Sequence, residues 1–235
     1  MVHTRGKLDE RETRRIVFLD TPDHTLRRGG LVLRRRAVGE SLEYTLKCRS
    51  DDRYFAAGTD VAAGDGPEGE TKLEEDIAPP FRCRYSHSTT ITLAGVSKVA
   101  SRKTPKTLLE ATALFPGLGT LRSDGRQCDP ETALDVVNSI TVDESVWKGG
   151  KIIFETDGEA NSEKATVALI LWARGKAGRP AVAELSFRLK DSGEHSSRNL
   201  AEAARSAYTL LQRLDCCRPE GMTKTEYVYR DASRD

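Results

Sequence analysis

Charged and apolar residues alternate along two neighbouring segments, and this alternation limits what the chain can fold into. The segments 31–38 and 41–48 are separated by Gly39 and Glu40, which have the length and chemistry of a tight hairpin turn. Opposite residues of a hairpin share a face, so one face is predicted to be charged and the other apolar. The charged face holds Arg34, Arg36, Glu43 and Lys47. The other face holds Leu31, Leu33, Leu42, Tyr44 and Leu46, with Arg35 as the exception.

Two further segments show the same alternation. Segment 70–77 places Glu70, Lys72, Glu74 and Asp76 on one face, and segment 183–190 does so with Glu184, Arg188 and Lys190. One interpretation is an antiparallel sheet with a solvated face. The other is a barrel whose charged interior holds a polyanion and its metal ion, while the apolar faces pack outward against helices. The alternation leaves both open.

The order of elements favours an α+β fold that is mainly antiparallel β. Turn residues separate strands expected at 16–19, 31–38, 41–48, 71–77, 134–146, 151–155, 166–173, 181–190 and 223–229. Two amphipathic helices are expected, one opening at Thr104-Pro105 and one with its apolar stripe between Leu200 and Leu214. A parallel α/β sheet would alternate helices with strands regularly. We expect one domain over residues 15–230, preceded by a polar, frayed segment 1–14.

Composition excludes some function classes. Lys and Arg number 37 against 36 Asp and Glu, so bulk positive charge cannot hold nucleic acid. No stretch has the roughly 20 apolar residues of a membrane span, and we expect a soluble, cytoplasmic protein without a membrane partner. The five cysteines form no CxxC pair, and reduced thiols are expected.

Polar residues cluster after the first expected strand. Asp20, Thr21, Asp23 and His24 precede a single helical turn that ends at Gly29. Asp20, Asp23 and His24 alone do not make a metal site, and we expect this cluster to cap the helix.

Five stretches together resemble the CYTH family, also called triphosphate tunnel metalloenzymes, which includes triphosphatases and class IV adenylate cyclases. The most specific is FLDTPDHTLRRGGLVLRRR, at 18–36. The others are EYTLK (43–47), KLEED (72–76), AELSFRLK (183–190) and TKTEYVY (223–229). The resemblance implies an eight-stranded antiparallel tunnel with flanking helices. Its interior would carry Arg and Lys for the triphosphate and acids for Mg²⁺ or Mn²⁺.

The resemblance also implies roles for individual residues. Those similar to the family's phosphate-binding residues are Arg34, Arg36, Lys47, Lys72 and Lys224. Those similar to its metal-binding acids are Glu74, Asp76 and Glu184. The alternation of charged and apolar residues also places Arg34, Arg36 and Lys47 on one face.

The chain departs from the family pattern in two places. The family begins with a Glu-x-Glu-x-Lys strand and a helix before the Asp-Thr-Pro phrase, and this sequence has no room for that unit between Met1 and Ile16. On the late strand, Ser186 and Arg188 follow Glu184 where the family alternates acids. The barrel is therefore expected to lack its first strand, and metal binding is in doubt.

Three functions follow from this pattern. The first is metal-dependent hydrolysis of an inorganic or organic triphosphate inside the tunnel. The second is a non-catalytic module of the same fold that binds phosphate or polyphosphate. The third is an open barrel whose exposed edge is completed by another chain or by a homodimer.

Overall fold

The computed structural model describes residues 2–66, 68–78, 82–94, 104–155, 162–174, 179–189, 197–215 and 222–230. The chain divides into two compact units. Unit 1 comprises Met1–Thr13 and Asp143–Gly221, and unit 2 comprises Arg14–Val142 and Met222–Asp235. The boundaries of a single domain at 15 and 230 stay a prediction.

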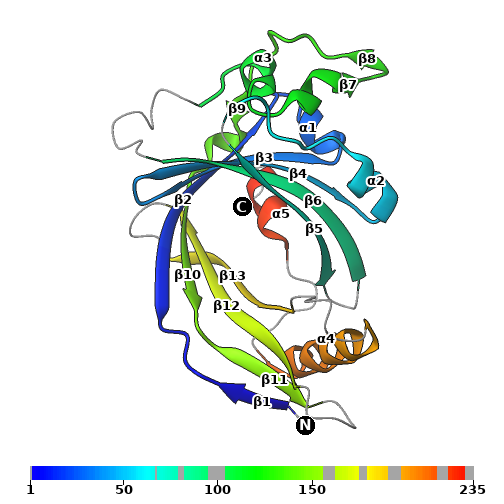
Figure 1. Ribbon diagram of the computed structural model, residues 1–235. Coiled ribbons are helices and arrows are strands. Elements are labelled where there is room, and N and C mark those ends of the chain that lie inside the picture. Colours follow the sequence, from blue (N-terminus) through cyan, green and yellow to red (C-terminus); the bar gives the residue numbers. More distant parts are fainter. Residues whose placement is uncertain are drawn as a thin grey trace. The chain divides into compact units, whose positions relative to one another are not determined.

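Unit 2 contains an antiparallel sheet in the order β2-β3-β4-β6-β5 (Figure 1). Its strands are β2 (Glu10–Asp20), β3 (Leu31–Val38), β4 (Ser41–Ser50), β5 (Gly69–Ala78) and β6 (Arg82–Leu93), and the short β9 (Asp135–Val136) pairs with β2. The predicted hairpin is confirmed, because Arg36 lies opposite Glu43 and Arg34 opposite Thr45. Gly39 takes a left-handed φ of 55° in the turn, a conformation that costs glycine little.

The apolar face of this sheet forms the core of unit 2. It packs against α3 (Leu108–Thr112) and the 3₁₀ helix η1 (Pro116–Thr120), while α2 (Arg53–Gly58) lies near β4 and β6. Figure 1 shows α1 (Thr25–Arg28), α2 and α3 on one side of the sheet and α5 (Lys224–Tyr229) on the other. Buried residues include Leu33, Leu42, Leu46, Ile91, Phe115 and Leu118. Each such side chain contributes about 1.5–3 kcal/mol through burial.

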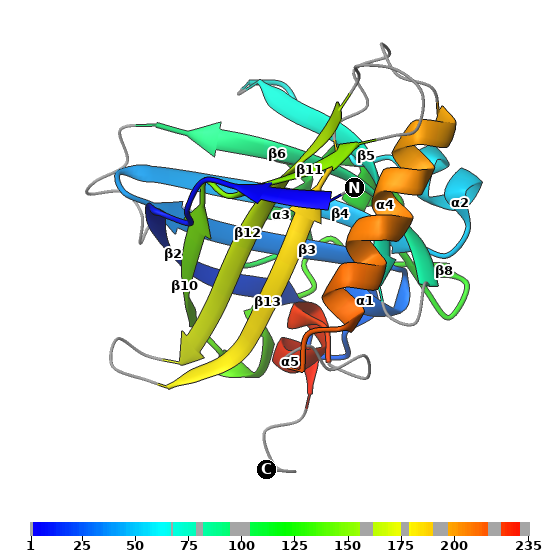
Figure 2. The ribbon, with the colours of Figure 1, turned by 90° about the horizontal axis from the view of Figure 1, so that it is seen from below.

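Unit 1 is also antiparallel, and α4 (Ser197–Gln212) packs on its strands β11 and β12 (Figure 2). Its strands are β1 (Val2–Arg5), β10 (Val142–Lys148), β11 (Lys151–Glu155), β12 (Ser162–Arg174) and β13 (Pro180–Arg188). β11 pairs with β1 and β12, and β12 pairs with β13. The predicted class, mainly antiparallel β with flanking helices, is therefore confirmed. Among the described residues, no helix is long and apolar enough to cross a membrane.

Segment 1–14 differs from the expected frayed start. Val2–Arg5 form β1, and β2 already begins at Glu10. Lys148 pairs with Glu12 at 3.4 Å within unit 1, and Arg11 lies over the ring of Trp147. These polar residues therefore gain order from pairing with later strands, which a hydrophobicity pattern does not reveal.

Three expected elements have other boundaries or types. The helix after Thr104 begins at Leu108, because Thr107 and not Thr104 caps it. The expected strand 134–146 is divided into β9, the 3₁₀ turn η2 (Val137–Ser139) and β10. Asn138 and Ser139 have left-handed φ values there, which no strand accommodates. The hairpin β7 (Arg122–Ser123) and β8 (Arg126–Gln127) was not anticipated.

The last expected strand, 223–229, is wrong. Lys224–Tyr229 form α5, because Thr223 and Glu226 make a capping box in which each side chain bonds the other residue's backbone N–H. These two bonds satisfy backbone N–H groups at the start of the helix, which have no acceptor within the helix itself.

The capping box gives the first testable prediction. Thr223→Ala removes the acceptor for the Glu226 amide and should lower the free energy of unfolding by about 1 kcal/mol. Thr225→Ala, in the same helix but outside the cap, serves as the control and should be neutral or slightly stabilising. Urea unfolding followed by circular dichroism measures both. Equal unfolding free energies for the two variants would contradict a role for the cap.

Candidate functional site

The candidate site is the face of the unit 2 sheet that lies opposite the core, called here the charged face. Strand pairing aligns alternate residues of four strands on it: Arg34 and Arg36 on β3; Glu43, Thr45, Lys47 and Arg49 on β4; Ser86, Ser88, Thr90 and Thr92 on β6; Glu70, Lys72, Glu74 and Asp76 on β5. The register thus brings Arg34, Arg36, Lys47 and Lys72 together on one face. Glu74 and Asp76 share it.

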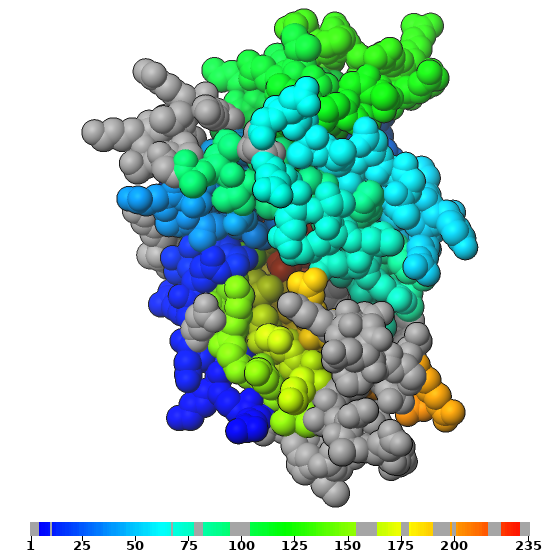
Figure 3. Space-filling view, viewed as in Figure 1, coloured from blue at the N-terminus to red at the C-terminus, as the bar shows by residue number. Residues whose placement is uncertain are grey.

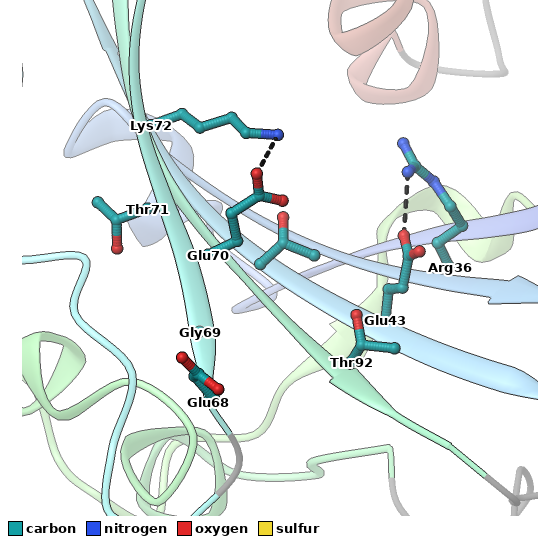
Figure 4. A pocket seen from close by; sticks show the side chains of 9 residues that line it. Arg36, Glu43, Glu68, Gly69, Glu70, Thr71, Lys72 and Thr92 are labelled. Atoms are coloured by element: carbon teal, nitrogen blue, oxygen red, sulfur yellow. Dashed lines mark hydrogen bonds and ion pairs between the residues drawn. The ribbon is translucent and has the colours of Figure 1, made fainter.

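One end of the charged face forms a pocket of about 620 Å³, called here the first pocket (Figure 4). Arg36 Nη1 pairs with Glu43 Oε2 at 3.0 Å, and Lys72 Nζ pairs with Glu70 Oε1 at 2.9 Å. The remaining lining residues are Glu68, Gly69, Thr71, Thr90 and Thr92. Carboxylates therefore already balance the two basic groups at this end of the face.

Hydroxyl groups lie between the charged side chains. Arg34 Nη2 donates to Thr45 Oγ1 at 3.3 Å, and Thr45 Oγ1 lies 2.9 Å from Thr90 Oγ1. This chain of contacts orients the Arg34 guanidinium above β4. Such hydroxyls can donate to or accept from a bound oxyanion.

Further along β4, one partly buried cluster joins side chains of both charges. Asp76 Oδ2 accepts from Arg49 Nη2 at 2.9 Å and from Ser86 Oγ at 2.8 Å. Burial alone would raise the pKa of Asp76, but the charges of Lys47 and Arg49 outweigh it and lower that pKa. For Lys47, burial is the main effect and the charge of Arg49 adds to it, so the pKa falls from 10.5 to about 8 despite nearby Asp76 and Glu74.

Lys47 gives the second prediction, a pH-dependent stability. Because its folded pKa of about 8 lies below the unfolded value of 10.5, the folded state binds fewer protons between these pH values. Stability therefore rises with pH there, by at most about 3 kcal/mol for this lysine. The difference in unfolding free energy between wild type and Lys47→Met, measured by urea denaturation, should therefore change by up to this amount between pH 7 and pH 10.5. A difference that is independent of pH would contradict it.

The predicted metal ligands do not form a complete site in unit 2. Glu74 and Asp76 share the charged face, but Asp76 is bonded to Arg49 and Ser86. Glu184 lies in unit 1, on β13 opposite Ile170. Throughout the described part of the chain, no three His, Cys, Asp or Glu side chains are grouped so as to hold a metal ion. On this face Glu74 and Asp76 supply two carboxylates, so a divalent cation held there would take its remaining oxygen ligands from water or from phosphate groups.

The Asp-Thr-Pro-Asp segment is structural, as expected. Buried Asp20 accepts from the backbone N–H groups of Leu26 and Arg27, and Thr21 Oγ1 accepts from the Thr25 amide. His24 itself makes no side-chain cap. Tyr229 of α5 donates to Asp20 Oδ2 at 2.8 Å, and burial raises the pKa of this tyrosine. The segment therefore fixes α1 and α5 at the edge of the charged face.

Some residues of the site differ from the sequence-based set. Lys224 is the first residue of α5 and half-buried. Arg49 was missed, although the alternation from Thr45 and Lys47 continues to it. The hydroxyl residues of β6 were missed because no strand was expected at 82–93, where Thr89-Thr90-Ile91-Thr92 was the available signal.

Comparisons with known proteins give structural matches only. Neither a protein-family model nor a curated protein matches the chain. A candidate adenylate cyclase from Bacillus halodurans is 12% identical and aligns with a TM-score of 0.41 over 96% of each chain. HpAC1 from Hippeastrum, described as a candidate adenylyl cyclase with dominant triphosphatase activity, is 12% identical with a TM-score of 0.37, covering 94% of this chain and 83% of its own. These two alignments extend over nearly the full length of this chain.

Proposed function

We propose that the charged face of unit 2 binds the phosphate groups of a triphosphate or polyphosphate ligand. The observation that carries this proposal is Lys47, a partly buried ammonium group that shares the charged face with Arg34 and Arg49. Burial and like charge both disfavour its protonated form. A bound anion would offset this cost, and phosphate oxygens are strong acceptors for Lys and Arg.

The surrounding side chains suit a row of phosphate groups. Basic residues on this face include Arg34, Arg36, Lys47, Arg49 and Lys72. The Arg36 Nε–H is buried and has no hydrogen-bond partner in the described part of the chain, so a ligand oxygen could accept from it. Guanidinium groups can bind phosphate in a bidentate manner, while hydroxyls such as Thr90 supply further donors.

Hydrolysis of the bound triphosphate with Mg²⁺ or Mn²⁺ is the second candidate function. Glu74 and Asp76 share the charged face with Lys72, and this favours it, because carboxylates near phosphate groups are typical of phosphoryl-transfer sites. Asp76, however, is already bonded to Arg49 and Ser86. Binding without turnover therefore ranks first.

One assay series separates these functions. Purified protein is mixed with inorganic triphosphate or ATP, with and without Mg²⁺ or Mn²⁺, and both phosphate release and thermal stabilisation are measured. Stabilisation without release is the result expected for a binding module. Release that depends on the metal would establish hydrolysis. If neither compound stabilises the protein and none is hydrolysed, both functions are wrong.

A further inference from the structure

A second pocket, of about 260 Å³, opens beyond the first pocket within unit 2. Its lining residues are Arg27, Gly30, Arg49, Ser50, Asp51 and Arg84. Glu43 of the first pocket and Arg49 of the second are six residues apart on β4, so the two pockets are separated by about 20 Å along the strand. No residue lines both pockets.

Three guanidinium groups reach the second pocket from α1, β4 and β6. Arg84 uses Nε to bind Asp51 at 2.9 Å, and Arg49 uses Nε and Nη2 to bind Ser86 and Asp76. These contacts leave both terminal nitrogens of Arg84 and the Nη1 of Arg49 for other acceptors. The Arg27 guanidinium lies 5.3 Å from the centre of the Tyr229 ring and has no ion pair with any described residue.

The carboxylates near this pocket are fewer and more exposed. Asp51 is the only acid of the lining, and its side chain is 67% exposed. Asp76 is bonded to Arg49, and Glu226 of α5 is exposed. The pKa of Glu226 is lowered mainly by hydrogen bonds from Thr223, with smaller effects of Arg27 and Arg84. Positive charge therefore dominates the lining itself.

We infer that this second pocket, which shares Arg49 with the charged face, is a further binding site for a phosphoryl dianion. Arg27, Arg49 and Arg84 converge on it from three elements, and their unused N–H groups match the several acceptor oxygens of a phosphoryl group. The dianion is either free orthophosphate or the terminal phosphate of a longer ligand. This inference holds whether or not the charged face binds triphosphate.

The test is a titration of the full chain with orthophosphate and, separately, with inorganic triphosphate, by calorimetry. The double variant Arg27→Gln/Arg84→Gln should weaken orthophosphate binding at least about tenfold, because two charge-assisted donors are lost. Arg53→Gln is the matched control, since Arg53 is exposed and belongs to α2. The cyan part of the chain lies at the surface in Figure 3. The control should bind as wild type does.

The two ligands distinguish the source of the phosphoryl group. If the double variant loses affinity for orthophosphate only, the pocket binds free orthophosphate. If it loses affinity for triphosphate equally, the pocket binds the terminal phosphate of a longer ligand. Both results support the site. Unchanged affinities for both ligands in the double variant would overturn it, as would a wild-type chain that binds neither. If orthophosphate binds and triphosphate does not, the proposed function fails while this site stands.

A second variant tests the pocket even if the double variant does not fold. Asp51→Asn removes the acid that competes for Arg84 and should tighten orthophosphate binding about threefold, in line with the strength of an exposed ion pair. An unchanged or weaker affinity in a folded Asp51→Asn protein would contradict the inference.

Discussion

Replacing Asp20 by alanine is expected to lower the free energy of unfolding by about 3–5 kcal/mol, because several buried donors lose one shared acceptor. Asp20 is 1% exposed. Its Oδ1 accepts from the amides of Thr21 and Leu26 at 2.8 and 2.9 Å. Its Oδ2 accepts from the Arg27 amide at 3.1 Å and from the Tyr229 hydroxyl at 2.8 Å. The variant therefore loosens both α1 and α5.

Asp23 supplies the control for this experiment. It bonds Thr21, Thr25 and Arg28, but its side chain is 55% exposed, so Asp23→Ala should cost no more than about 1 kcal/mol. Urea unfolding measures both variants. If the two alanine variants are equally stable, Asp20 does not have the structural role described here.

The double variant Arg34→Gln/Arg36→Gln is expected to weaken the binding of inorganic triphosphate at least about 100-fold. Hydrogen bonds to charged groups contribute about 1.5–3 kcal/mol each, and the double variant removes the positive charge of two adjacent positions on one face of β3. Calorimetric titration at fixed ionic strength measures the change, since salt screens exposed charges.

Arg35→Gln is the matched control for this variant. Arg35 lies between the two on β3, but its side chain belongs to the opposite, apolar face. Its replacement should change triphosphate affinity less than threefold. Equal losses for Arg35→Gln and the double variant would show that general charge, and not the charged face, holds the ligand.

Much of the fold followed from the spacing of charges. The hairpin over 31–48 was predictable because a two-residue turn sets the register of both strands. Once the register is known, it places Arg34, Arg36 and Lys47 on the face opposite Leu33 and Leu46. The apolar face then needs cover, which α3 and η1 provide.

Other features could not be read in the same way. The alternation in 223–229 suited a strand, but the hydrogen bonds between Thr223 and Glu226 stabilise a helix. The second pocket depends on α1, β4 and β6 meeting in space, and no local pattern connects Arg27 with Arg84. Long-range strand pairing also decides the structure of 2–5, which pairs with 151–154.

Proton uptake on binding of inorganic triphosphate near pH 8.5 tests whether the phosphate groups lie on the charged face. The pKa of Lys47 is about 8, so part of the population is neutral at that pH, and an anion bound beside it would raise the pKa. Calorimetry in two buffers of different ionisation enthalpy should show between about 0.2 and 1 proton taken up per triphosphate, because a single lysine titrates. The uptake should be absent in Lys47→Met. Binding with the same uptake in both proteins, or no binding to the wild type, would contradict the placement of the phosphate groups on the charged face.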